Sequence, residues 1–455
     1  MLDKFLVIFC LVALCWAQRR GGGGGGGFYP GGERGAGAAQ SKFGEIELQL
    51  LKHIYESDPD GGITFSPLSI RTLLAMLSEG AQGKTKTDLE EALGDTRSIR
   101  RVLGYSSRGG IAMGNSFYLS NNLNINEAFK EKLTSSYKAE FQYADFSRPR
   151  SAAYNINEWV RRITNKGISE LISPQSLSPE SVFMMVNAIH LTAKWTKKFD
   201  SEETVTDGIF YESHSGELKP KLAEMMRNYE HFRYGTVESL NAQVIELPFQ
   251  VPENHAMYVV LPTDPNGLKD LINKLTPESL GDILKTMNNP IQLTLYLPKF
   301  KASTTQNLKT ILPGKVAQVF SPSADISGIS PDRNIQLSEV LHKANLKVDE
   351  EGATGSAATA VQAILLSNTP QIVMNVSHPF LYFIAEQVNE RHFDFYSSSN
   401  QEIYFMGYVS NLDDSRELPS NWGPLPPKQP YNPYQGYTQG NRRRPGNNRR
   451  ERQNN

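Results

Sequence analysis

Residues 350–370, EEGATGSAATAVQAILLSNTP, form a long run of small and aliphatic residues between two glutamates and a proline. Between Ala353 and Thr369 the chain has no charge, no proline and no aromatic ring. Every second residue from Ala353 onward is small or aliphatic: Ala353, Gly355, Ala357, Thr359, Val361, Ala363 and Leu365. Such period-two alternation is typical of a half-buried strand. The stretch therefore predicts a strand that can enter a sheet, and a flexible Ala/Ser/Gly linker is the alternative.

The composition of the whole chain is that of a globular protein with a sizeable core. Of its 455 residues, 39% are apolar and 21% are charged. This length permits one large domain or about two to three average ones. The formal net charge of −1 hides an asymmetry, because residues 418–455 carry seven Lys or Arg and one acid. The C-terminal end is therefore basic and the remainder is acidic.

The first 17 residues have the pattern of a secretory signal peptide. Lys4 precedes an apolar run from Phe5 to Leu14, and Ala17 is the small residue before the expected cleavage. The run is too short for a transmembrane helix, so we expect no membrane span. Both cysteines of the chain lie in this segment. The sequence predicts a secreted, extracellular protein whose mature chain has no disulfide and relies on its core.

Both ends of the mature chain are poor in core-forming residues. Residues 18–41 include seven consecutive glycines, and residues 413–455 are rich in Pro, Gln, Tyr, Asn and Arg. We expect both segments to be disordered and the folded domain to span residues 42–412. The Arg-rich end is a candidate binder of an anionic matrix polymer, with a solvated tail as the alternative.

Between the two ends, helix and strand patterns mix without strict alternation, which favours an α+β fold. Ser66-Pro67 is a good N-cap and first-turn pair for a helix over SPLSIRTLLAMLSEGAQG, residues 66–83. INEWVRRI suggests another helix. Short runs rich in branched and aromatic residues predict strands at residues 243–249, 257–263, 291–298 and 402–409.

No local motif indicates a catalytic or cofactor site. SEGAQGKT departs from a phosphate-binding loop because Ser78 replaces its first glycine. The eight histidines form no H-x-x-x-H pair, and G-x-S-x-G is absent from the sequence. We therefore expect no metal, no cofactor, no nucleic-acid partner and no enzymatic activity. A catalytic triad scattered along the sequence is the remaining alternative.

Several longer stretches resemble the serpin family of serine protease inhibitors, in order along residues 42–412. They are TFSPLSIRTLLAMLSEGAQGKT (64–85), INEWV (156–160), VNAIHLTAKWTKKFD (186–200), LHKANLKVDEEG (341–352), HPFLYFI (378–384) and IYFMGYVSNL (403–412). The loop itself most resembles that of antichymotrypsin-type serpins, in SAATAV and LLS. The resemblance implies a large central mixed sheet with smaller sheets, about eight or nine helices and an exposed mobile reactive loop.

The resemblance also implies suicide-substrate inhibition of a serine endopeptidase by a monomer. The protease cuts the loop and becomes acyl-linked to it, and the freed loop inserts as a central strand of the large sheet. The family's usual spacing from Gly352 places the cut between Leu366 and Ser367. Leu366 favours a chymotrypsin-like target, with elastase- or cathepsin-type proteases as the alternative. A non-inhibitory carrier or chaperone with the same fold is the rival interpretation.

Three sets of residues take roles through this resemblance. The hinge and inserting strand are Glu350, Glu351, Gly352, Ala353, Gly355, Ala357, Thr359, Val361 and Ala363. A polar cluster beneath the opening of the sheet consists of Ser66, Ser69, Asn187 and His342. Above it, at the breach, Glu350 and Lys299 form a pair beside Trp195.

The sequence departs from the family's pattern in the loop, where Ala353, Thr354 and Gly355 replace the usual Thr, Glu and Ala. Because glycine loses the most conformational freedom on ordering, we expect Gly355 to slow insertion. Asn375-Val376-Ser377 is an N-glycosylation sequon just past the loop, and an unmodified Asn375 is an equal alternative.

Overall fold

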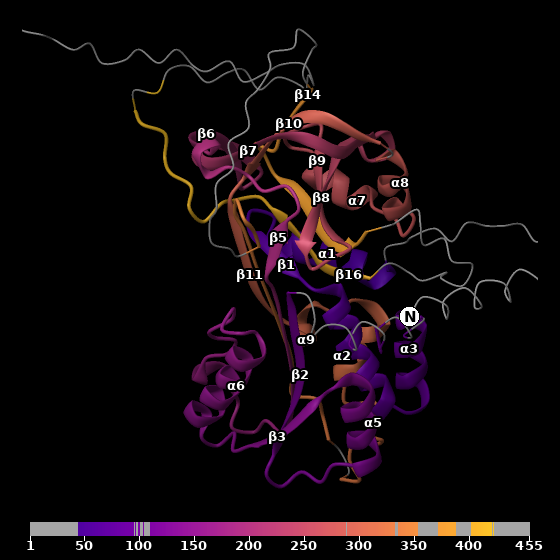
Figure 1. The fold of residues 1–455 in the computed structure, drawn as a ribbon. Helices are drawn as coiled ribbons and strands as arrows, with labels where there is room; N and C mark the ends of the chain where they lie inside the picture. The colour runs from indigo at the N-terminus through magenta and orange to yellow at the C-terminus, as the bar shows by residue number, and fades with distance from the viewer. Residues whose placement is uncertain are drawn as a thin grey trace, which may run out of the picture. The chain divides into compact units, whose positions relative to one another are not determined.

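The computed structural model describes residues 44–94, 96, 99–100, 103, 110–287, 289–332, 335–353, 372–387, 402–420 and 422 (Figure 1). The predicted signal peptide, the Gly-rich segment 18–41 and the Arg-rich end lie outside the described residues. The same holds for the inserting residues Gly355, Ala357, Thr359, Val361 and Ala363 and for the predicted reactive bond Leu366–Ser367.

Two of the long helices begin at a residue whose side chain caps them. Ser66 caps α2, since its Oγ accepts a hydrogen bond from the backbone of Ser69, and Asn126 caps α5 in the same way. The main helices are α1 (Glu45–Ser57), α2 (Pro67–Gly80), α3 (Gly83–Leu93), α5 (Glu127–Tyr137), α6 (Pro149–Ile163), α7 (Leu268–Lys274), α8 (Ser279–Thr286) and α9 (Leu308–Ile311). Nearly every residue of α2 is buried, so this helix lies inside the protein and not on its surface.

A five-stranded sheet forms the part of the fold that carries the site. Its strands, in spatial order, are β11 (Phe300–Asn307), β12 (Glu339–Val348), β4 (Phe183–Leu191), β2 (Ile111–Ser120) and β3 (Glu140–Ala144). The pairs β12–β4 and β2–β3 are parallel, whereas β11–β12 and β2–β4 are antiparallel. β4 is buried along its whole length, as expected for a central strand covered on both faces.

The remaining strands join into an eleven-stranded sheet whose main path runs β1-β16-β15-β9-β8-β7-β10-β14, with β5, β6 and β13 attached at its side. They are β1 (Gly62–Phe65), β5 (Ala193–Trp195), β6 (Val205–His214), β7 (Glu217–Val237), β8 (Ala242–Val251), β9 (His255–Pro262), β10 (Pro290–Pro298), β13 (Gly352–Ala353), β14 (Ile372–Asn375), β15 (Phe380–Glu386) and β16 (Ile403–Val409). The four strands predicted from the sequence correspond to β8, β9, β10 and β16.

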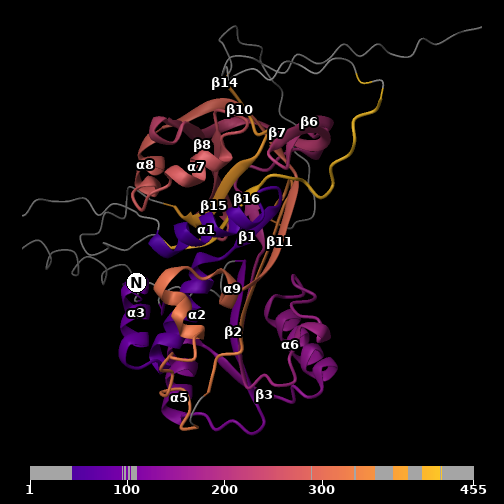
Figure 2. The same ribbon diagram turned by 180° about the vertical axis from the view of Figure 1, so that it is seen from behind.

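Helices cover both faces of the five-stranded sheet. α6 lies on one side of β2, and α2 and α5 lie on the other (Figures 1 and 2). Trp159 and Ile156 of α6 pack with Met184 and Val186 of β4 in one apolar cluster. Alternate residues of the same strands point to the α2 side, where the main core lies. The mixed arrangement of helices and sheets confirms the α+β prediction.

Structure continues past the predicted end of the domain at Leu412. The backbone of Arg416 exchanges two hydrogen bonds with Leu222 of β7, with N–O distances of 2.8 and 2.9 Å. Asp414 pairs with Lys301 at 2.8 Å, and Glu417 pairs with Lys221. The expectation of disorder from residue 413 onward is therefore wrong for residues 413–417, because the edge of β7 supplies backbone partners that composition cannot reveal.

Candidate functional site at the opening of the five-stranded sheet

The parallel pair β12–β4 joins two central strands of this sheet, and we call it the seam. Its ladder runs from Glu339 opposite Met184 to Asn345 opposite His190. β12 continues beyond this last pair to Val348 and leads directly into the hinge residues. The predicted polar cluster spans the middle of the seam, and the predicted breach lies at its outgoing end.

His342 and Asn187 join the two strands of the seam through their side chains. The backbone N–H of Ser66 donates to Nε2 of His342 at 3.0 Å, so Nδ1 carries the ring proton. Nδ1 then donates to Oδ1 of Asn187 at 2.8 Å. The amide of Asn187 in turn donates to Oδ1 of Asn115 at 2.9 Å. This chain of bonds uses one tautomer and one amide orientation throughout, which gives each buried polar group a partner.

Burial keeps His342 neutral. The ring is fully inaccessible to solvent, and this burial lowers the pKa of His342 to about 3. A second proton would have to go on Nε2, which already accepts from Ser66. Protonation would thus both charge a buried ring and remove its bond to the cap of α2.

Ser66 and Ser69 attach the cluster to the start of α2. Oγ of Ser66 accepts from the backbone of Ser69 at 3.1 Å, and the hydroxyl of Ser69 donates to Sδ of Met113 at 3.2 Å. The structure therefore brings all four predicted residues together, and it adds Asn115 and Met113 of β2. The sequence analysis missed these two, although one asparagine inside the apolar strand at residues 111–120 was a usable signal.

A tight turn at residues 349–352 sends the chain back from β12. Gly352 and Asp349 exchange backbone hydrogen bonds of 2.9 and 3.3 Å, and Gly352 then pairs with Lys194 in the short β13–β5 ladder. The φ angle of Gly352 is 147°, and a Cβ at this position would lie 2.1 Å from the carbonyl oxygen of Ala193. Only glycine fits this backbone path without moving β5.

Glu350 is bound on several sides at the breach. Its carboxylate lies 2.7 Å from Nζ of Lys299 and accepts from the hydroxyl of Thr204 at 2.7 Å, and its carbonyl accepts from the backbone of Phe199. Partial burial opposes ionisation, but the hydrogen bonds from Lys299 and Thr204 outweigh it and lower the pKa of Glu350. The structure thus forms the predicted Glu350–Lys299 pair, and Lys299 also bonds Glu224 at 2.8 Å.

Trp195 closes the breach from the side of β5. Its indole N–H donates to the carbonyl of Asp349 at 2.9 Å, and its backbone N–H donates to the carbonyl of Glu351 at 3.0 Å. The ring is buried and stacks on Phe249 with centroids 4.8 Å apart. Glu351 pairs with Lys198 at 2.6 Å. Both backbone and side-chain bonds therefore hold the predicted hinge in place.

Asn375 lies in β14 beside Tyr296 of β10. The residue is half-buried, and its side-chain oxygen is buried without a hydrogen-bond partner. Glycosylation of Asn375 stays a prediction, with an unmodified asparagine as the alternative.

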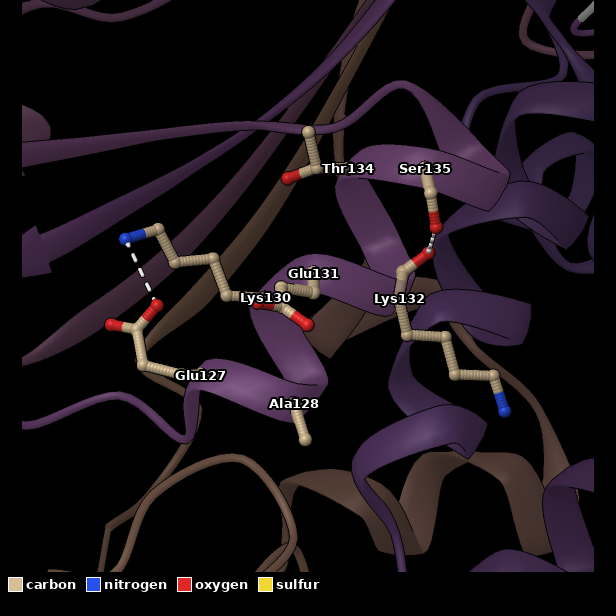
Figure 3. Close-up of a pocket in the computed structure, with 7 residues that line it drawn as sticks. All are labelled: Glu127, Ala128, Lys130, Glu131, Lys132, Thr134 and Ser135. Carbon is tan, nitrogen blue, oxygen red and sulfur yellow. Dashed lines mark hydrogen bonds and ion pairs between the residues drawn. The ribbon is translucent and has the colours of Figure 1, made fainter.

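The described surface also has an open cleft along α5, but its polar side chains do not converge on a common point. This cleft of about 750 Å³ is lined by α5 residues alone. Two of them, Glu127 and Lys130, form an ion pair with 3.5 Å between the charged atoms (Figure 3). Thr134 and Ser135 point in different directions and do not converge on a common point (Figure 3). Across the described ranges, His, Cys, Asp and Glu form no group suited to a metal ion. Nor does any described helix combine the length and apolarity needed to cross a bilayer.

Comparisons with known proteins identify the family. The family described as Serpin (serine protease inhibitor) matches residues 39–412. Antichymotrypsin-2 of Bombyx mori is 31% identical over 74% of this chain and 92% of its own length, and Iripin-2 of Ixodes ricinus is 29% identical over 88% and 96%. Among solved structures, Serpin48 of Tenebrio molitor superposes with a TM-score of 0.68 at 25% identity, covering 81% of this chain and 96% of that one. Thyroxine-binding globulin in complex with thyroxine, at 24% identity and a TM-score of 0.70, shares the fold. The chain belongs to the serpin family.

Proposed function

We propose that this protein is a secreted inhibitor that traps a chymotrypsin-like serine endopeptidase by inserting its cleaved loop between β4 and β12. Serine protease inhibition in general follows from the family and from relatives named antichymotrypsin, antitrypsin and leukocyte elastase inhibitor. The target class rests on Leu366, and the trapping mechanism rests on the seam and the hinge. We expect the inhibitor to act as a monomer.

The observation that carries the proposal is the position of the hinge at the outgoing end of a parallel seam. β12 leads through Asp349–Gly352 into the uncharged run that begins at Ala353. An inserted strand between β4 and β12 would be antiparallel to both, which requires the chain to reverse at this turn. The turn at residues 349–352 already reverses the chain after β12.

The covalent step uses the protease's own chemistry. The hydroxyl of its catalytic serine attacks the carbonyl carbon of Leu366, and the bond from Leu366 to the nitrogen of Ser367 breaks. The leaving amine of Ser367 takes the proton that the protease's histidine removed from the serine, and an ester to Leu366 remains. Insertion then moves this ester to the far end of the sheet before water can hydrolyse it.

Incubation with a panel of chymotrypsin-, elastase- and trypsin-like proteases tests the proposal. We expect an SDS-resistant complex with a chymotrypsin-like enzyme, and mass spectrometry of that complex should place the ester on Leu366. A matched Leu366→Arg variant should transfer complex formation to a trypsin-like enzyme. Cleaved inhibitor with fully active enzyme across the whole panel would contradict the proposal. If the melting temperature also fails to rise after loop cleavage, the non-inhibitory carrier or chaperone is favoured.

The two ends of the chain are included in the proposal. We infer that cleavage after Ala17 exposes Gln18 as the mature N-terminus, which sequencing of secreted protein tests. We also infer that the Arg-rich end binds an anionic polymer, because it carries most of the positive charge of residues 418–455. A truncation after Glu417 should elute from a sulfated-polysaccharide column at lower salt than the full chain while retaining inhibition.

A further inference from the structure

Met113 differs from the other methionines in the part of the chain that the structure describes, because it alone is not buried. The buried ones are Met76, Met184, Met185, Met225, Met226, Met257, Met287, Met374 and Met406. Met113 lies near the start of β2, whereas β3 pairs with β2 only from Ser116 to Ser120. A cleft of about 450 Å³ opens at this edge, lined by Met113, Ile163, Asn165 and Thr192 among others. Solvent therefore reaches this methionine.

The same side chain also contacts the polar cluster of the seam. Sδ of Met113 accepts a hydrogen bond from the hydroxyl of Ser69 at 3.2 Å. Ser69 is bonded to Ser66, which in turn is bonded to His342. Met113 further packs against both major apolar clusters of the protein. One residue thus connects this cleft to the bonds that hold β4 and β12 together.

We propose that Met113 is a selective oxidation site for hydroperoxides, and that its oxidation weakens the closed seam. The sulfur lone pair attacks one peroxide oxygen, the O–O bond breaks and an S–O bond forms. With hydrogen peroxide the products are methionine sulfoxide and water, so sulfur loses the two electrons that the peroxide gains. The nine buried methionines are protected by their packing.

The sulfoxide changes the contacts beside Ser69. Its oxygen is a far stronger acceptor than a thioether, and it adds volume at a junction of two packed clusters. We expect the added oxygen to displace the first turn of α2, which weakens the bond from the Ser69 backbone to Oγ of Ser66 and the bond from the Ser66 backbone to His342. We therefore expect oxidised protein to melt about 2 °C lower than untreated protein. If the proposed inhibitory function holds, on which this readout rests, spontaneous loss of inhibition on storage should also be about fivefold faster.

Peroxide titration of the intact full-length protein, followed by peptide mass spectrometry, tests the site. We expect one added oxygen on the Met113 peptide at least about tenfold sooner than on any buried methionine, as thiol and thioether oxidation follows exposure. Residues 350–370 contain neither methionine nor cysteine, so loop oxidation cannot mimic the effect. Uniform oxidation of all methionines, or none at Met113, overturns the proposal.

A Met113→Leu variant tests the coupling, because leucine keeps the volume but has no sulfur. The melting temperature of this variant should not respond to peroxide. In oxidised wild-type protein, methionine sulfoxide reductase should restore the melting temperature of untreated protein. An oxidised wild-type protein that melts at the untreated temperature overturns the coupling to the seam. These readouts need no protease, so they separate a failure of this inference from a failure of the inhibitory function. A Ser69→Ala variant should still be oxidised but should show a smaller melting shift.

Discussion

Asn187 and His342 face each other across the parallel seam between β4 and β12, with 2.8 Å between Oδ1 of the asparagine and Nδ1 of the histidine. The two residues are also direct partners in the strand register. Any strand that enters between β4 and β12 must separate them. Strand insertion at this place would therefore have to break their hydrogen bond. Substituting either His342 or Asn187 tests how much this bond contributes.

Acidification should weaken the closed state through His342. The ring's folded pKa of about 3 lies below the ordinary histidine value of about 6.5. The neutral ring therefore stabilises the native state fully above about pH 6.5, and this contribution is lost as pH falls toward 3. A single group of this kind changes stability by at most about 1.4 kcal/mol per pH unit. Melting temperatures measured from pH 7 to pH 4 should fall less steeply in His342→Gln than in wild type.

His378 supplies the control for this titration. It is buried, burial lowers its pKa to about 4, and its ring bonds to the carbonyl of the adjacent Pro379. His378→Gln should also flatten the melting curve with pH, but it should leave the rate of spontaneous loop insertion unchanged. Equal pH profiles for His342→Gln and wild type would show that the cluster does not hold the neutral ring.

Removing the amide of Asn187 should destabilise the native state by about 2 kcal/mol, because it leaves two buried groups without partners. These are the Nδ1–H of His342 and Oδ1 of Asn115. Chemical denaturation of Asn187→Ala should show this loss. Asn273→Ala, at an exposed position of α7, should cost less than about 0.5 kcal/mol. A similar small effect at both positions would argue that the seam is not held by this network.

Gly352→Ala should destabilise the pairing of residue 352 with β5 and so favour loop insertion. The added Cβ would collide with the carbonyl of Ala193, and alanine rarely adopts a φ of 147°. An extended, inserted strand has no such restriction. The substitution therefore destabilises only the state in which the loop has not inserted. We expect spontaneous loss of inhibitory activity to be about tenfold faster, as a bias of about 1–2 kcal/mol would produce.

Gly216→Ala is the matched control for the hinge. Gly216 also has a positive φ, of 84°, but no atom lies within 4 Å of its Cβ position, and it sits at the tip of the β6–β7 hairpin. This variant should be slightly less stable and should keep the wild-type lifetime of inhibition. Identical lifetimes for Gly352→Ala and Gly216→Ala would remove the argument for a clash at the hinge.

Glu350→Gln should make the breach open more readily, because it removes the charge that Lys299 and Thr204 bind. The carboxylate's lowered pKa means that its contribution is present near neutral pH and is lost as pH falls through the lowered value. The pair is partly exposed, so high salt should narrow the difference from wild type. Insertion rates of added loop peptide measure the effect. Glu91→Gln, which breaks the exposed Lys315–Glu91 pair, should leave those rates unchanged.

Ala357→Arg should turn the inhibitor into a substrate. Ala357 belongs to the alternating set that faces inward in the predicted inserted strand, and a buried unpaired charge there costs several kcal/mol. Ala358→Arg, on the alternate set, is the control and should retain most of the inhibition. The fraction of inhibitor that is cleaved without forming a complex measures both. Unchanged trapping by Ala357→Arg would exclude burial at this position.

Local sequence signals predicted much of the fold, because they act within a few residues. Ser66-Pro67 predicted the start of α2, and branched runs predicted β8, β9, β10 and β16. The resemblance to serpins also predicted the four-residue polar cluster. The prediction failed at residues 413–417, where order comes from the edge of β7 and not from the tail's own composition. Asn115 and Met113 were missed because their partners, Asn187 and Ser69, are distant in sequence.

The sequence by itself determined the uncharged character of residues 353–369, the leucine at position 366 and the glycine at position 352. These are properties of composition and spacing, so no contact is needed to define them. Only the tertiary structure decided that Gly352 clears the carbonyl of Ala193, that His342 is held neutral between Ser66 and Asn187, and that Met113 links a cleft to the seam. Each of these depends on a distance between segments far apart in the chain, and such distances are set when the sheet and α2 pack together.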